Sequence, residues 1–406
     1  MIDRREFLRR TMALGLAPAM LPLRAGAAPA TPPRVRRRVP LGRTGLAVPD
    51  IAFGTSRLAG DVSLVHHALD RGITYFDTAE DYTRGASEET LGRALEGRRD
   101  EVVLTSKTGA RADARRADLF DALEGSLRRL RTDRIDIYMN HAVNDVARLR
   151  NDEWFEFVAR AKAQGKIRFS GLSGHGGHLA ECLELAIDEG LVDVVLVAHN
   201  FGQDPTFFER FTRSSDLVAR QPGLPPLLRR ARAKGIGAIA MKTLRGARLN
   251  DMRPYEGAGA TFAQAAFRWV LAGGLVDALV VTMNTPEQVD EYLGASGWTT
   301  AHHADVGLLR RYAQRTQASQ CRYGCLGCEG ACPRGHPIPD LLRARMYAED
   351  YEAPELAAAA LRAEGLSSDA CAGCDGSPCA DACPHGLAIP ELAARLPAAL
   401  GRLADR

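Results

Sequence analysis

Four side chains between residues 77 and 141 are of types that can move a proton between a protein and a ligand: Asp77, Tyr82, Lys107 and His141. Three of them stand at the ends of short apolar, β-branched stretches, and Tyr82 stands on the loop after the first stretch. An ammonium beside a phenol favours the phenolate and lowers the phenol pKa from its ordinary value of about 10, while a carboxylate pairs with the ammonium. The set predicts a site for general acid catalysis, with His141 as a neutral donor that orients a carbonyl oxygen beside Tyr82.

Each of these residues has a simpler structural interpretation when it is taken alone. A buried Asp and Lys are more often an ion pair that holds a fold together, and a buried His often has no role beyond its own hydrogen bonds. The set is more informative than its members, because groups with shifted pKa values cluster at functional sites. We therefore expect the four side chains to face one cavity.

The second chemically capable group is a set of cysteines. Eight of the nine cysteines lie in the last quarter of the chain, whereas Cys182 stands alone on an amphipathic stretch and is expected to be a buried small apolar residue. The eight form two sets, each ending in Cys-Pro: Cys321, Cys325, Cys328 and Cys332, then Cys371, Cys374, Cys379 and Cys383. Thiolates hold iron, and close spacing lets one loop wrap a cubane. The pattern resembles two-cluster ferredoxins and predicts two [4Fe-4S] clusters.

The stretch between the two sets, including residues 338–347 and 356–364, has the pattern of helices. We therefore expect a C-terminal, mostly helical, cysteine-rich iron-sulfur domain in which Cys383 completes the first cluster and Cys332 the second. Zinc and disulfides are the alternative uses of these cysteines, the latter because an exported protein meets oxidising conditions. A further alternative is that the clusters only staple the tail of the chain.

The elements that must position these residues alternate between strands and helices. Apolar β-branched stretches are followed by amphipathic ones over roughly 250 residues, the length typical of one barrel of eight strand–helix units. The expected strands are residues 51–54, 73–77, 102–107, 135–141, 167–172, 192–197, 236–241 and 278–281, and the expected helices are 62–70, 87–95, 118–130, 154–163, 179–189, 226–233 and 262–271. The sequence thus predicts an α/β fold, a (β/α)8 TIM barrel. An open doubly wound sheet is disfavoured because no GxGxxG turn follows the first strand.

The N-terminus has the pattern of an export signal. Arg4-Arg5 precedes a short apolar stretch, and Ala25-Gly26-Ala27 offers a cleavage point. The pattern resembles twin-arginine signals, so residues 1–27 are expected to direct the protein to the periplasm. The apolar stretch is short and interrupted by proline, so no membrane span is expected beyond the signal. A disordered basic tail is the alternative. The basic run at 34–38 is expected to be a solvated lead-in to a hairpin at 41–46.

From residue 40 to about residue 295 the chain resembles the aldo-keto reductase family. The resemblance is carried by Leu41-Gly42-Arg43-Thr44-Gly45, Phe76-Asp77-Thr78-Ala79 through Tyr82, Thr105-Ser106-Lys107, Asp133-Arg134-Ile135-Asp136 through His141, and Lys166-Ile167-Arg168 through Gly171-Leu172-Ser173. It implies Tyr82 as the proton donor, Lys107 and Asp77 as the residues that tune it, and His141 as the residue that orients the carbonyl. It also implies hydride transfer from a nicotinamide to an aldehyde or ketone, a chemistry that belongs to the cofactor.

The family's cofactor contacts are only partly kept. Ser173 matches the family pattern, but the asparagine that follows it in the family is Gly174 here, and the glutamine of the sixth strand is Leu196. The aromatic residue after the seventh strand is replaced, and residues 282–287 lack the Lys or Arg that grips the adenosine phosphate. Lys242 is the candidate for that charge. NADP(H) is thus implied by the family, but these replacements and an exported location, where no nicotinamide pool is expected, count against it.

Length and composition allow one large domain and a smaller module. The 406 residues are 46% hydrophobic and 25% charged, and a net charge of +3 gives no case for nucleic acid. The expected division is a signal peptide at 1–27, the barrel at 34–300, a linker helix at 301–318 and the ferredoxin-like [4Fe-4S] domain at 319–400.

Two functional hypotheses follow from these patterns. The first is an exported oxidoreductase that acts on a small carbonyl or alcohol substrate, with clusters that relay electrons to or from a redox partner protein. The second is an electron-transfer or interaction protein whose barrel is catalytically silent. A nicotinamide moves a two-electron hydride whereas a cluster moves single electrons, so the first hypothesis needs either a bound two-electron cofactor between them or a barrel that no longer uses nicotinamide.

Overall fold

The computed structural model describes residues 32–202, 223–244, 252–257, 260–316, 319, 321, 325–350 and 353–401. The signal peptide expected at residues 1–27 lies outside these ranges. Residues 33–406 form one compact unit, and the fold below is that of its described part.

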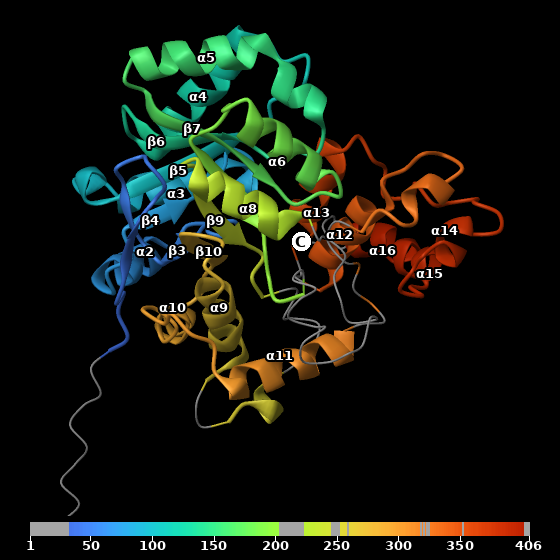
Figure 1. The fold of residues 1–406 in the computed structure, drawn as a ribbon. Helices are drawn as coiled ribbons and strands as arrows, with labels where there is room; N and C mark the ends of the chain where they lie inside the picture. Colours follow the sequence, from blue (N-terminus) through green and yellow to red (C-terminus); the bar gives the residue numbers. More distant parts are fainter. Residues whose placement is uncertain are drawn as a thin grey trace, which may run out of the picture. The chain divides into compact units, whose positions relative to one another are not determined.

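Eight parallel strands close into a barrel in the order β10-β3-β4-β5-β6-β7-β8-β9 (Figure 1). The strands are β3 (Ile51–Gly54), β4 (Tyr75–Asp77), β5 (Val103–Thr108), β6 (Ile135–Asn140), β7 (Ile167–Gly174), β8 (Val194–Ala198), β9 (Gly237–Met241) and β10 (Ala278–Thr282). The last strand pairs in parallel with the first, with Val281 opposite Phe53. The predicted (β/α)8 barrel is therefore confirmed, and the open sheet is excluded by this closing pair.

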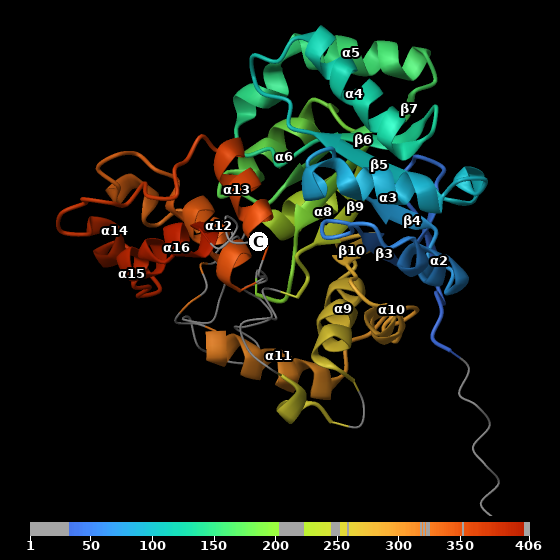
Figure 2. The ribbon, with the colours of Figure 1, turned by 180° about the vertical axis from the view of Figure 1, so that it is seen from behind.

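Helices follow the strands along the chain and surround the barrel (Figures 1 and 2). They are α2 (Val62–Asp70), α3 (Ala86–Ala94), α4 (Arg116–Leu130), α5 (Asp152–Ala163), α6 (Leu179–Asp188), α8 (Leu224–Ala233), α9 (Phe262–Ala272) and α10 (Pro286–Leu293). Short 3-10 turns lie at η1 (Tyr82–Gly85), η2 (Arg99–Glu101), η3 (Val146–Arg150), η6 (Arg253–Tyr255) and η7 (Glu329–Ala331). Each helix buries one apolar stripe against the strands, as its amphipathic pattern predicts.

The hairpin expected at residues 41–46 is present and pairs β1 (Arg38–Pro40) with β2 (Ala47–Pro49). Its apolar side chains, such as Leu41 and Val48, pack into one core with the side chains that fill the barrel interior. The arginines of the basic run at residues 34–38 are exposed, as expected for a solvated lead-in, but the segment also contacts the barrel. Arg38 donates to the Thr74 hydroxyl at 2.7 Å, and Val35 packs against the main core, so the segment is bound to the barrel.

The linker expected at residues 301–318 contains α11 (His303–Thr316), which is part of the packed barrel domain. Its Leu309 and Tyr312 are fully buried, and the Tyr312 ring lies 4.5 Å from the ring of Phe262 between centroids. A buried ion pair between Arg268 and Asp305, at 3.4 Å, joins α9 to α11. The helix therefore packs as an element of the fold, and residues 317 and 318 lie outside the described ranges.

The C-terminal segment is helical, as predicted. It contains α12 (Ile338–Glu349), α13 (Pro354–Ala363), α14 (Pro378–Asp381), α15 (Ile389–Ala394) and α16 (Leu396–Gly401). The side chains of α12, α13 and α16 share one small core, whereas a second small core joins α12 and α15 to the cysteine loops.

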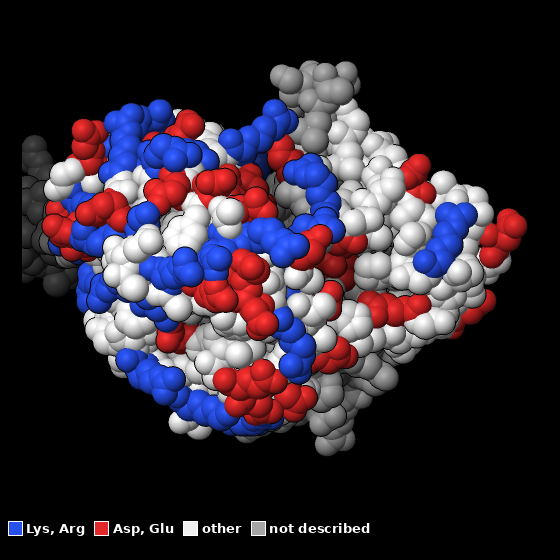
Figure 3. Space-filling view, turned by 90° about the horizontal axis from the view of Figure 1, so that it is seen from above, with Lys and Arg blue, Asp and Glu red and all other residues white. Residues whose placement is uncertain are grey.

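Two findings concern the surface and the length of the helices. On the face drawn in Figure 3, Lys and Arg side chains are interspersed with Asp and Glu. Over the part of the chain that the structure describes, no helix combines the length and the apolar character needed to cross a membrane.

Candidate active site

The ends of β4 and β5 place Asp77 and Lys107 beside each other. The two strands pair in parallel, and the Lys107 Nζ donates to Asp77 Oδ1 and to the Thr78 carbonyl oxygen, each at 2.7 Å. Asp77 is 3% exposed and Lys107 is fully buried. Because a buried charge is costly unless it is paired and hydrogen-bonded, these contacts are what keep the ammonium inside the barrel.

Tyr82 begins η1, directly above this pair. The Lys107 Nζ lies 3.4 Å from the phenol oxygen and donates to it, so the phenol's own hydrogen is left to point at a ligand. Thr83 and Arg84, the next two residues, have φ values of 49° and 57°, a left-handed conformation that costs a non-glycine residue on the order of 1 kcal/mol. The Thr83 hydroxyl holds the turn by donating to the Leu58 carbonyl at 3.0 Å. Strain of this kind is typical of functional sites.

The expectation that Lys107 lowers the phenol pKa was wrong in direction. Burial, followed by the carboxylates of Asp77 and Asp81, raises the pKa of Tyr82 well above its ordinary value of 10. The ammonium does not offset this because its charge is already balanced by Asp77 at 2.7 Å. Tyr82 therefore keeps its proton at neutral pH, which is the state a general acid requires.

His141 follows β6 and lies edge-on against Tyr82, with ring centroids 5.6 Å apart and an interplanar angle of 76°. Burial lowers the pKa of His141 to about 4, Lys107 lowers it further, and Asp81 opposes the shift. The imidazole is therefore neutral at pH 7 and retains one N–H donor. Its Nδ1 lies 3.6 Å from Asp81 Oδ1, which is longer than a hydrogen bond.

Arg148, which the sequence analysis did not single out, fixes the turn that carries His141. Its guanidinium donates to the carbonyl oxygens of His141 at 2.7 Å, Ala142 at 2.9 Å and Ala110 at 2.7 Å. A fourth bond, at 2.6 Å, goes to the Asn140 side chain. Arg148 is a positioning residue, and its place on η3 after the strand gave no spacing signal.

The two residues predicted to bind a cofactor also lie in the cavity. Ser173, near the end of β7, is buried and accepts a hydrogen bond from the Ala142 backbone N–H at 3.0 Å. Lys242 follows β9. Leu196 lines the same wall. A Cβ added at Gly174 would lie 3.0 Å from the Val143 carbonyl oxygen and 2.5 Å from Leu179, so packing here favours the absence of a side chain.

These residues line a cavity of about 940 Å³ at the C-terminal mouth of the barrel. Its floor and walls come from strand ends and the loops after them, including Asp77, Tyr82, Lys107 and His141. The structure thus brings all four predicted catalytic residues together. A volume of this size is near the upper end for small-molecule and cofactor sites.

The C-terminal segment supplies another part of the cavity lining, which sequence reasoning missed. Tyr347 of α12 and several small residues of α13 line it, and α13 also contacts η1, which carries Tyr82. Glu364, which caps α13, lines it as well, and burial and Asp340 raise its pKa to about 7 while Arg343, Arg148 and Asn144 oppose the shift. The only available signal was the helical pattern at residues 356–364, which says nothing about what the helix covers.

Several polar contacts hold the C-terminal segment to the barrel loops. The Asn144 side chain donates to Asp340 at 3.3 Å and accepts from the His178 backbone N–H at 2.9 Å. His178 also lies 3.3 Å from Glu329, next to the first cysteine set. Asp340 forms a buried ion pair with Arg343. These contacts connect the cysteine-rich segment to the mouth of the barrel.

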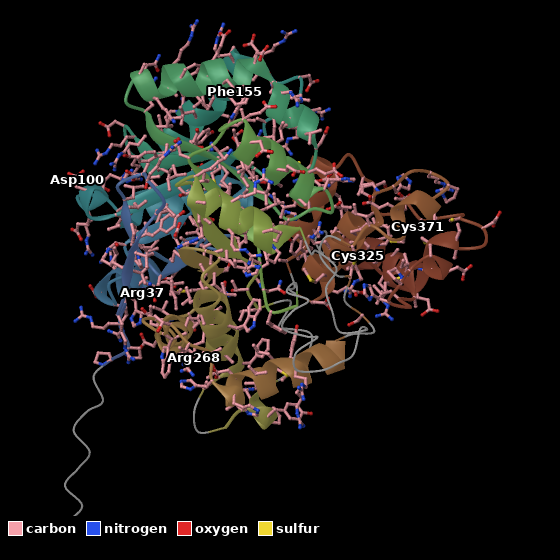
Figure 4. All side chains as sticks on the ribbon, in the orientation of Figure 1. Arg37, Asp100, Phe155, Arg268, Cys325 and Cys371 are labelled. Atoms are coloured by element: carbon pink, nitrogen blue, oxygen red, sulfur yellow. The ribbon has the colours of Figure 1, made fainter. Side chains whose placement is uncertain are left out.

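The two Cys-Pro ends cross over between the cysteine sets. Pro384, after the last cysteine, packs on Gly327 of the first set, where an added Cβ would lie 2.9 Å from the proline Cδ. Arg334, after the first Cys-Pro, donates to the Ala370 carbonyl at 3.0 Å and the Gly373 carbonyl at 3.3 Å, beside the second set. This is the arrangement that an exchange of the fourth cysteine requires. Figure 4 shows Cys325 and Cys371, one from each set, within the C-terminal part.

The electrostatics of the thiols follow the same division. Burial raises the pKa of Cys328 to about 12, and the nearby Cys383 and Cys325 add to the shift. Burial also raises the pKa of Cys371, with further contributions from Cys379 and Cys332. In the described part of the chain, the cysteines of the two sets form no disulfide bonds. The donor type, the number of thiols and the crossing of the two Cys-Pro ends are those that two four-iron clusters with an exchanged fourth cysteine would need.

Within the described ranges, no group of three or more His, Cys, Asp or Glu side chains lies in a position to hold a single metal ion.

Comparison with known proteins gives one family and one fold. Residues 50–307 match the model of the aldo/keto reductase family. The uncharacterised oxidoreductase YqkF of Bacillus subtilis is 33% identical over 150 residues, which are 34% of this chain and 48% of that protein. The uncharacterised oxidoreductase YrpG of the same organism is 29% identical over 308 residues, covering 63% of this chain and 89% of that protein. This chain thus spans about half of YqkF and most of YrpG.

Among solved structures, an aldo-keto reductase from Klebsiella pneumoniae in complex with NADPH is similar with a TM-score of 0.52 and 25% identity. The similarity covers 68% of this chain and 95% of that one. The matched family region, residues 50–307, ends before the first cysteine of the C-terminal sets.

Proposed function

Because the chain belongs to the aldo/keto reductase family, we propose that it is an oxidoreductase that reduces a small carbonyl substrate or oxidises the corresponding alcohol. The observation that carries this proposal is the contact between the Lys107 ammonium, the Asp77 carboxylate and the Tyr82 phenol, with the neutral His141 ring against the phenol. All four side chains line one cavity of about 940 Å³.

The protein's own groups can bind and protonate a carbonyl oxygen. His141 donates its N–H to the oxygen and orients it beside Tyr82, which lies 5.6 Å away between ring centroids. Tyr82 then gives the oxygen its proton. The Lys107 ammonium, 3.4 Å from the phenol oxygen, stabilises the phenolate that remains, and Asp77 holds the ammonium in place. Because the pKa of Tyr82 is raised, the phenol keeps its proton until a substrate binds.

NADP(H) is the cofactor that the family suggests, and the Klebsiella relative is in complex with NADPH. A nicotinamide supplies or accepts the hydride when it is bound. Ser173, which lines the cavity, is the residue that would hold it. Asn284 and Gln288, at the start of α10, line the same cavity and bond to each other at 2.8 Å through the Asn284 backbone N–H.

The C-terminal cysteines support a redox role that the barrel alone does not require. We propose two [4Fe-4S] clusters, one held by Cys321, Cys325, Cys328 and Cys383, and the other by Cys371, Cys374, Cys379 and Cys332. These clusters would exchange electrons with a redox partner protein. The twin-arginine pattern at residues 1–27 supports export of the folded protein to the periplasm.

The second candidate function is an electron carrier whose barrel does no hydride chemistry. The observation that favours it is Leu196, a buried apolar side chain on the cavity wall where the family places a glutamine. A carrier binds no NADPH and still shows reversible reduction of its clusters.

Replacement of Tyr82 by Phe tests the enzyme proposal. We expect carbonyl-dependent oxidation of NADPH to fall by roughly 10²- to 10⁴-fold, the range typical for a general acid, while NADPH binding followed by fluorescence is unchanged. Tyr75→Phe is a matched control, because the Tyr75 hydroxyl is buried against Thr105 at 2.9 Å and does not line the cavity. Equal loss in both variants, or no turnover of any aldehyde or ketone by the wild type, contradicts the proposal.

Iron analysis tests the clusters. Anaerobically purified protein should contain about eight iron and eight sulfide per chain, as expected for two four-iron clusters. Zinc in place of iron would end the cluster proposal and leave the barrel proposal standing.

A further inference from the structure

The amine of Lys242 is buried, and no carboxylate among the described residues pairs with it. Its Nζ is inaccessible to solvent and has no hydrogen-bond acceptor among the residues that the structure describes, although the residue lines the cavity. Its backbone is left-handed, with φ of 57°, a conformation that is unfavourable for a lysine. A strained backbone with an unsatisfied polar group is costly, and such features persist chiefly where they have a function.

A second unsatisfied atom lies close to this amine. His175, just after β7, has a buried Nδ1 with no partner among the described residues, and it also lines the cavity. Both side chains contact the ring of Tyr347: the Lys242 Nζ is 4.4 Å from its centroid, and the His175 ring is 6.3 Å away, edge-on. Two strand ends of the barrel and one helix of the C-terminal segment thus converge around one small volume.

The other cations near this volume are already neutralised or saturated. Lys107 is paired with Asp77, and Arg343 is paired with Asp340. Arg148 donates to three backbone carbonyls and to Asn140. Lys242 therefore stands out because no carboxylate of the described chain balances it.

The charges around Lys242 explain why its charged form is disfavoured without a ligand. Burial lowers the pKa of Lys242 well below its ordinary value, Arg343 lowers it further, and Asp340 only partly opposes this. Lys242 in turn contributes to the lowered pKa values of His175 and of the catalytic His141. An anion beside Lys242 would supply the missing counter-charge, and Lys242 and His141 line the same cavity.

We propose that Lys242 and His175, under the ring of Tyr347, form a subsite for the carboxylate of the substrate, so that the carbonyl compound is an oxo acid. This inference rests on the proposed function, because it places the carboxylate at Lys242 and the carbonyl oxygen at Tyr82 and His141. A carboxylate fits better than a phosphate, since the subsite offers one cation and one imidazole nitrogen, enough for a single negative charge.

Calorimetric binding of matched ligand pairs tests the subsite without requiring turnover. Pyruvate and 2-oxobutyrate are compared with their uncharged amides, in the purified full-length protein at pH 8 and without nicotinamide. We expect each acid to bind at least tenfold more tightly than its amide. Binding of the acid should also take up to one proton per site from the buffer, measured as a difference in heat between two buffers, because Lys242 regains its charge.

Lys242→Met should weaken acid binding at least tenfold, abolish the proton uptake and leave amide binding unchanged. Arg111→Gln is the matched control, because Arg111 also lines the cavity but is 82% exposed and paired with Asp113. It removes one positive charge without touching the subsite, and we expect less than a twofold change. Should Lys242→Met fail to fold, the acid and amide comparison in the wild type decides the matter alone.

The outcomes separate this inference from the proposed function. Equal affinity for acid and amide overturns the oxo-acid subsite even if neutral ketones are turned over. Tighter binding of inorganic phosphate than of pyruvate overturns the choice of carboxylate. Acid-selective binding that depends on Lys242 supports the subsite, and it does so even if the wild type turns over no aldehyde or ketone.

Discussion

The mouth of the barrel and the cysteine-rich segment differ in whether their buried ionisable groups have partners within the chain. At the barrel mouth the ammonium of Lys107 donates three hydrogen bonds, to Asp77, Thr78 and Tyr82. In the cysteine-rich segment, burial and neighbouring thiols raise the pKa of Cys321 and of Cys328 to about 12, although Arg343 partly opposes the shift at Cys321. In the first region the charge of Lys107 is balanced by Asp77, whereas in the second the thiolates of Cys321 and Cys328 are disfavoured.

The difference shows which region depends on a ligand for its organisation. A parallel strand ladder fixes the barrel groups, and their partners are other groups of the same chain. Thiols that repel one another when ionised need a positively charged centre to become thiolates, and the proposed iron clusters would provide it. The barrel site is therefore preorganised, and the cysteine segment is expected to be organised by what it binds.

Removal of iron should produce the largest effect and should break only one of the two regions. Structural metal sites contribute on the order of 10 kcal/mol to folding, so the apo protein should lose the fold of residues 325–350 and 353–401. Limited proteolysis should cut these residues rapidly while the barrel remains resistant. Cys182→Ala is the control, because Cys182 is buried in α6 away from both sets and should leave the iron content unchanged. A barrel that unfolds together with the tail would contradict the comparison.

Replacement of Lys107 by Met should remove the charge that balances Asp77 in the barrel site. It leaves the Asp77 carboxylate buried without its partner, and we expect the free energy of unfolding to fall by about 3–5 kcal/mol at pH 8 in urea denaturation. The loss should shrink toward pH 5, because burial raises the pKa of Asp77 and the carboxyl is then easily protonated.

Lys234→Met is the control for this loss, since the Lys234 side chain is 47% exposed and bonds to a backbone carbonyl at 2.8 Å. Its effect should remain below about 1 kcal/mol. Similar losses in both variants would mean that the Lys107–Asp77 pair is no more than an ordinary surface-like contact.

The smallest expected effect is the pH-dependent contribution of the buried His199 to the stability of the barrel. Burial lowers the pKa of His199 to about 4, and the ring packs on Trp269 at 5.4 Å between centroids. In the unfolded state the His199 imidazole takes up a proton below about pH 6.5. In the folded state it takes up that proton only near pH 4. The contribution of His199 is therefore complete above pH 6.5 and is lost as the pH falls to about 4.

The size of this contribution is about 3 kcal/mol, since one pKa unit is worth about 1.4 kcal/mol. His199→Leu should lose less stability than the wild type between pH 7.5 and pH 4.5, measured by urea unfolding. His141 shows a similarly lowered pKa and remains in the variant, so part of the acid sensitivity should persist. Superimposable pH profiles of the variant and the wild type would rule out a buried neutral His199.

Local patterns predicted the barrel and its four polar residues well. A strand and its side-chain alternation depend on neighbours in sequence, so the ends of β4, β5 and β6 could be located, and with them Asp77, Lys107 and the position of His141. Helix starts were less certain: the helix expected at residues 87–95 begins at Ala86, after Gly85, and the Ser87 hydroxyl bonds to Thr55.

The pKa of Tyr82 could not be predicted because its shift depends on burial. The sequence shows that an ammonium and a phenol are near each other, which alone would lower the phenol pKa. It does not show that Asp77 and Asp81 also lie near the phenol or how far the fold buries the ring. These effects are properties of the closed cavity.

The sequence by itself determined the closed sheet, the proton-transfer residues at its mouth and the two cysteine sets, because strand periodicity and ligand spacing are local. Only the tertiary structure decided that α12 and α13 line the same cavity as those residues, with Tyr347 against Lys242. Contacts between segments about 100 residues apart are set by packing and charge compensation across the whole fold. The lack of a counter-charge at Lys242 can therefore be recognised only from the packed structure, not from the sequence.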